Sequence, residues 1–75
     1  MLFPNKLFSY NESILSKLPI VLKELKKQPL GVRELYQKVT RSLDGVNEYM
    51  DVLDCLYALH EIEYDEKEGV LRYVI

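Results

Sequence analysis

The sequence is poor in the residues on which most catalytic and metal sites depend. It has one cysteine, Cys55, one histidine, His60, and no tryptophan, and its three glycines are isolated at positions 31, 45 and 69. A lone cysteine cannot form an internal disulfide, and no second Cys or His is present to complete a tetrahedral metal site. Isolated glycines form no phosphate-binding loop. We therefore predict no catalytic residue, no metal and no cofactor, and a protein that is not an enzyme.

Long hydrophobic runs are also missing. The longest apolar run covers residues 18–22, which is far short of the roughly 20 residues needed to span a bilayer. The opening residues lack the basic start and apolar run of a signal peptide. A single unpaired cysteine in an apolar stretch is typical of a reducing compartment. These features predict cytoplasmic localisation without membrane contact.

The chain is short but has the composition of a globular protein. It contains 75 residues, of which 48% are hydrophobic and 29% charged. A domain of this size buries only about 60% of its unfolded surface, so its core is thin and leaves little room for a deep cleft. We predict one domain over residues 1–75 that works by binding other macromolecules.

Basic and acidic residues are separated along the chain. Residues 1–43 contain eight Lys or Arg and three Glu, whereas residues 44–66 contain eight Asp or Glu and no Lys or Arg. Such asymmetry bears on which macromolecule the chain can bind.

The hydrophobic pattern predicts three helices. Residues 1–10 are apolar and aromatic, and Pro4 and Asn5 argue against a helix and favour an extended arm or an edge strand. A helix is expected from Asn11 or Ser13 to about residue 27, either kinked at Pro19 or restarted with Ser16 as its cap. Further helices are expected over residues 32–39 and 46–59.

The C-terminal residues predict a β-hairpin. Two β-prone runs, 62–65 and 70–75, flank a polar loop that contains Gly69. Three helices followed by a hairpin are the order of a winged helix-turn-helix, a mainly α fold with a small β-hairpin (α+β). Its predicted core consists of Ile14, Leu18, Leu22, Leu35, Val39, Met50, Leu53, Leu56 and Val74.

The third helix is poorly suited to reading DNA. In a helix-turn-helix this helix enters the major groove and needs side chains that reach base edges. Here only Asn47 could do so, and Glu48, Asp51 and Asp54 would repel phosphates. Weak backbone contact would depend on a basic strip of Lys26, Lys27, Arg33, Lys38 and Arg41. We expect weak nucleic-acid binding or none.

The sequence suits a protein partner better than DNA. Aromatic residues are enriched at protein interfaces, and the apolar arm has more surface than the small remainder can easily cover. Tyr49, Tyr57 and Tyr64 are expected to fill the core with their hydroxyls at its edge. The predicted partner interface consists of Leu2, Phe3, Phe8, Tyr10, Tyr36, Glu48 and Asp51.

The chain resembles the small middle components of bacterial ABC-three component systems. The resemblance is carried by MLFPNKLFSYNESILSK, ELYQKV and VLDCLYALHEIEYDEKEGVLRYV. It implies a winged-helix adaptor that links an ABC-type ATPase to an effector in a conflict system, thought to act in antiviral defence. A homodimer is a further expectation, and the alternative function is a winged-helix DNA-binding transcriptional regulator.

Overall fold

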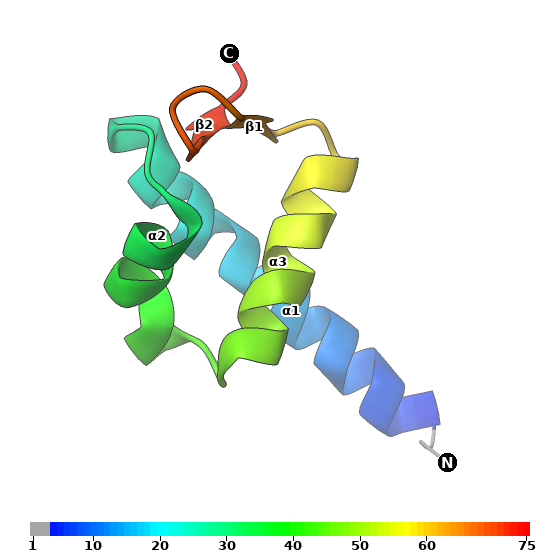
Figure 1. Ribbon diagram of the computed structural model, residues 1–75. Helices are drawn as coiled ribbons and strands as arrows, with labels where there is room; N and C mark the ends of the chain where they lie inside the picture. The colour runs from blue at the N-terminus through cyan, green and yellow to red at the C-terminus, as the bar shows by residue number, and fades with distance from the viewer. Residues whose placement is uncertain (1–3) are drawn as a thin grey trace.

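The computed structural model describes the backbone of residues 4–75 and the side chains of residues 9–75. Three helices pack together, and a hairpin closes one end of the molecule (Figure 1). The elements in chain order are α1 (Pro4–Lys27), α2 (Val32–Val39), the 3-10 helix η1 (Thr40–Ser42), α3 (Val46–Ala58), β1 (Ile62–Asp65) and β2 (Val70–Tyr73). The predicted α+β class is confirmed, and the layout is winged-helix-like.

The first helix begins earlier than predicted. Residues 4–10 are helical, so the extended arm over residues 1–10 is wrong for these positions, and residues 1–3 lie outside the described part of the chain. Proline suits the first turn of a helix because its fixed φ is already helical and its missing N–H has no partner there. Pro4 therefore begins α1 instead of preventing it, and the N-terminal turns of α1 project beyond α3 (Figure 1).

A second proline lies inside the same helix. α1 runs without interruption through Pro19 to Lys27. The hydroxyl of Ser16 donates to the carbonyl of Ser13 at 2.7 Å, and so Ser16 does not cap a restarted helix. Pro19 is exposed, and its ring therefore displaces no core side chain.

The hairpin and the segment before α2 form one small β structure. β1 and β2 pair antiparallel with Ile62 opposite Tyr73, as the sequence pattern predicts. The loop is fixed by Asp65, whose Oδ1 accepts the backbone N–H groups of Lys67 and Glu68 at 3.0 and 3.1 Å. Leu30 forms an isolated bridge to Leu71 in β2, which ties the hairpin to the residues that precede α2.

One hydrophobic core lies between the helices and the hairpin. Its buried side chains are Ile14, Val21, Leu25, Leu30, Leu35, Val39, Leu43, Tyr49, Val52, Leu53, Leu56, Ile62 and Leu71. Leu18 and Leu22 are half-buried and pack against it. Five of the predicted core residues are thus buried, namely Ile14, Leu35, Val39, Leu53 and Leu56.

The outward edge of α3 and two positions near the hairpin depart from the predicted core. Met50 is 45% exposed, Tyr57 and Tyr64 are exposed as well, and Val74 is half-buried. Apolar residues cover a wider arc of α3 than α1 and α2 can cover. The predictions that placed Met50 and Val74 in the core, and Tyr57 and Tyr64 in it with their hydroxyls at its edge, are wrong. On α3 itself, Tyr49, Val52, Leu53 and Leu56 form the buried face.

Candidate functional site

Glu48 is part of the internal structure and not of an exposed interface. Its side chain is only 4% exposed. Oε1 accepts hydrogen bonds from Lys17 Nζ at 2.7 Å and from the backbone N–H of Asp44 at 3.0 Å, and Oε2 accepts one from the Ser13 hydroxyl at 3.0 Å. The Lys17 hydrogen bond, followed by that of the Asp44 N–H, lowers the pKa of Glu48 although burial opposes the shift. The prediction of Glu48 as a partner contact is wrong, because its carboxylate joins α1 to the start of α3.

Tyr10 and Asp51 form a second link between α1 and α3. The hydroxyl of Tyr10 donates to the carboxylate of Asp51, and this hydrogen bond raises the pKa of Tyr10. Both side chains remain exposed. The two residues are thus brought together on the surface, as members of one interface would be.

Tyr36 lies in a different place, on a hollow between α2 and α3. Its ring packs at 4.8 Å, centroid to centroid, on that of Tyr49. The Tyr49 hydroxyl donates to the carbonyl of Val32 at 2.6 Å, and burial raises the pKa of Tyr49 to about 12. This α2–α3 hollow, of about 300 Å³, is lined by Val32, Arg33, Tyr36, Val46, Tyr49 and Met50.

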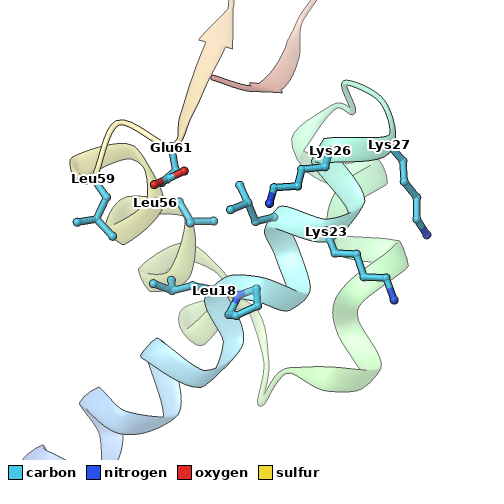
Figure 2. A pocket seen from close by; sticks show the side chains of 9 residues that line it. Leu18, Lys23, Lys26, Lys27, Leu56, Leu59 and Glu61 are labelled. Atoms are coloured by element: carbon cyan, nitrogen blue, oxygen red, sulfur yellow. The ribbon is translucent and has the colours of Figure 1, made fainter. Parts of the chain in front are cut away.

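A larger groove lies between α1 and the C-terminal end of α3 (Figure 2). This α1–α3 groove has a volume of about 550 Å³ and is lined by Leu18, Pro19, Leu22, Lys23, Lys26, Lys27, Leu56, Leu59 and Glu61. Leu59 is 56% exposed. The groove therefore presents an aliphatic surface beside three lysines on one side and Glu61 on the other.

The sequence interpretation missed the α1–α3 groove. Leu18 and Leu22 were placed in the core, and Leu59 was given no role. A signal was nevertheless present, because Leu15 and Leu22 are seven residues apart and so lie on one side of a helix beside the core stripe. Leu15 is exposed in the structure.

The predicted basic strip is divided among three places. Lys26 and Lys27 line the α1–α3 groove, whereas Arg33 lines the α2–α3 hollow. Lys38 and Arg41 are exposed on α2 and η1. Lys27 also pairs with Glu24 at 3.1 Å, so one of these charges is partly neutralised.

Three residues of the predicted interface cannot be placed. Leu2 and Phe3 lie outside the described residues, and the side chain of Phe8 lies outside them too, although its backbone belongs to α1. Their assignment to a partner interface stays a prediction.

Within the described residues, no three His, Cys, Asp or Glu side chains are grouped so that they could hold a metal ion. No described helix combines the length and the apolar character required to cross a membrane.

Comparison with protein families identifies the chain. The model of the family ABC-three component (ABC-3C) system Middle Component 7 matches residues 3–71, which is nearly the whole sequence. The chain belongs to this family. Membership in Middle Component 7 confirms the resemblance, fits a role in an ABC-3C system, and implies protein partners because such a system has several components. No curated protein and no solved structure matched the chain.

Proposed function

We propose that this Middle Component 7 protein is a non-enzymatic winged-helix adaptor that holds the ATPase and the effector of an ABC-3C system together, in antiviral defence. The observation that carries the proposal is the family match over residues 3–71. The surface supports it, because one hollow lies between α2 and the start of α3 and another between α1 and the end of α3, in a chain of only 75 residues. An adaptor needs two such surfaces to hold two partners at once.

Exposed apolar side chains give each surface an anchor. Leu59 is exposed within the α1–α3 groove, and Val46 and Met50 are exposed at the α2–α3 hollow. Burial of one such side chain is worth about 1.5–3 kcal/mol, so a few anchors suffice for a complex of moderate affinity.

The adaptor role is tested by co-purification. The tagged chain, co-expressed with the other components of its own ABC-3C system, should bring down both the ATPase and the effector. Met50→Asp should reduce the retained amount of one partner at least tenfold and leave the retained amount of the other unchanged. The substitution places a negative charge in the α2–α3 hollow only. Gel densitometry after affinity purification measures both ratios.

The control is Tyr64→Asp, which places the same charge on an exposed residue of β1 outside both hollows. It should retain both partners. Recovery of a single partner by the wild-type chain would contradict an adaptor, and equal losses from the two variants would contradict the assignment of the hollow.

A DNA-binding transcriptional regulator is the second candidate, favoured by the winged-helix-like layout and by exposed Arg33, Lys38 and Arg41. Against it, Asp51 and Asp54 occupy the exposed face of α3 with Asn47, where a reading helix would need cationic or amide side chains.

We expect gel shifts with random duplex and with the chain's own promoter to be alike and to vanish near about 150 mM salt, since only phosphate contacts would hold the DNA. A sequence-specific shift that persists at this salt concentration would favour the regulator over the adaptor.

A further inference from the structure

We infer that the α1–α3 groove binds an acidic amphipathic segment of a protein partner, with apolar side chains against the leucines and carboxylates against the lysines. The inference rests on the proposed function in that it names the chemistry of one of the two partners. It is carried by the distribution of charge around the groove (Figure 2).

The leucines and the charges of the groove are arranged as in a peptide-binding surface. Leu18, Leu22 and Leu56 are buried or half-buried in its floor, while Lys23 and Lys26 are exposed. A small-molecule pocket instead places a few polar groups among its apolar walls to orient the ligand. An aliphatic centre with charges outside it is the anatomy of a protein interface, and a groove between helices suits an amphipathic helix.

The charges favour carboxylates over other groups. Lys23 forms no ion pair within the described residues, and Lys26 Nζ lies 5.1 Å from the centroid of the Tyr73 ring without a carboxylate partner. Contact with an aromatic face restrains an ammonium group while its charge stays available. Two lysine charges of this surface are thus free for acidic residues of a partner.

Glu61 gives the two sides of the groove opposite charge. It lines the side formed after α3, opposite the lysines of α1 (Figure 2). Its backbone is fixed, because its N–H donates to the Leu56 carbonyl at 3.0 Å and its carbonyl accepts from the Val74 N–H at 2.9 Å. A bound helix would therefore turn its acidic edge toward α1 and a basic or neutral edge toward Glu61.

A second copy of this chain does not suit the groove. A two-fold dimer brings the same patch of both copies together. Each groove carries three lysines and one glutamate, so two grooves brought together would hold an excess of positive charge, and like charges at an interface are costly. The lysines thus select a partner of opposite charge.

The test selects ligands on the full chain. A library of random 15-residue peptides is displayed on phage and panned on the immobilised protein at low salt. Selected peptides should combine Asp or Glu with Leu, Ile or Phe at spacings of three and four. Titrated with the tightest peptide, the protein should show its largest ¹⁵N chemical-shift changes at Leu18, Leu22, Leu56 and Leu59.

Matched charge variants then separate the groove from overall charge. Lys23→Glu with Lys26→Glu should weaken the selected peptide about tenfold or more. Arg33→Glu with Lys38→Glu changes net charge equally but outside the groove, and it should change the affinity less than about twofold because distant charges are screened.

Several results would overturn the inference. The library could yield no enriched peptide, or only peptides without acidic residues. The ¹⁵N chemical-shift changes could lie outside the groove, or the two double variants could lose equal affinity for the peptide. Displacement of the peptide by a DNA duplex, or a homodimer that Leu59→Asp converts to monomer, would assign the groove to another occupant. Each of these results can occur while the chain still retains both the ATPase and the effector, so the inference can fail although the adaptor role holds.

Discussion

Replacement of Leu53 by alanine should lower the free energy of unfolding by about 2–5 kcal/mol. Leu53 is only 7% exposed and belongs to the core cluster on the inward face of α3. Truncation removes buried apolar surface and leaves a cavity that a close-packed interior fills only in part. Domains are stable by about 5–15 kcal/mol, so the loss is a large share. Urea denaturation followed by circular dichroism measures it.

Leu59→Ala is the matched control, because it removes the same atoms from the residue that follows α3. Leu59 is 56% exposed, and its truncation should change the stability by no more than about 0.5 kcal/mol. Equal destabilisation by the two substitutions would mean that the inward face of α3 is assigned wrongly. Leu59→Ala should also weaken the peptide selected for the α1–α3 groove, which separates binding from folding.

Elements with local signals could be predicted from the sequence. The hairpin has alternating β-prone runs around a loop with Gly69, whose φ of 67° favours glycine. The second helix follows the extended pair Leu30 and Gly31, and the Gly31 N–H donates to Glu34 Oε1 at 3.2 Å. In both elements the residues that fix the boundaries lie within a few positions of each other.

Pro4 misled the interpretation because proline has opposite effects at different helix positions. Inside a helix it removes a hydrogen bond, whereas in the first turn it removes nothing. The helical register of the following residues decides between these two cases. Tertiary contacts define this register. Ser13 and Lys17 bind Glu48, and Ile14 packs in the core.

The role of Glu48 was invisible in the sequence for a different reason. Its partners Ser13 and Lys17 lie more than thirty positions away. A carboxylate at the start of a helix is ordinarily a solvated, dipole-stabilising residue, and only the packing of α1 on α3 shows that this one is buried. The groove depends on the same packing, since Leu22 and Leu56 come from separate helices.

Replacement of Glu48 by alanine should lower the free energy of unfolding by about 3 kcal/mol, near the lower end of the cost of breaking a buried ion pair. The substitution leaves the ammonium of Lys17, the N–H of Asp44 and the hydroxyl of Ser13 without their acceptor. Lys17 is 18% exposed and keeps some access to water, so the largest penalties do not apply. Asp54→Ala is the control, since it removes an exposed carboxylate from the same helix, and it should change the stability by no more than about 0.5 kcal/mol.

The pH dependence of the Glu48 effect identifies the charge as its source. Hydrogen bonds lower the pKa of Glu48 in the folded chain from its ordinary value of 4.5, whereas the unfolded chain keeps the ordinary value. Above pH 4.5 both states are ionised and the contribution of the ion pair is complete. As the pH falls below 4.5 the unfolded chain takes up the proton first, and the contribution is lost through the lowered pKa. The stability gap between wild type and Glu48→Ala should therefore be constant between about pH 6 and 7 and narrow toward pH 3. Asp65, whose pKa is also lowered, is present in both proteins, so its contribution cancels from the difference.

Urea titrations of wild type and Glu48→Ala at each pH measure the stability gap. A gap of unchanged size at pH 3 would show that packing, and not the Lys17–Glu48 charge pair, holds α1 on α3.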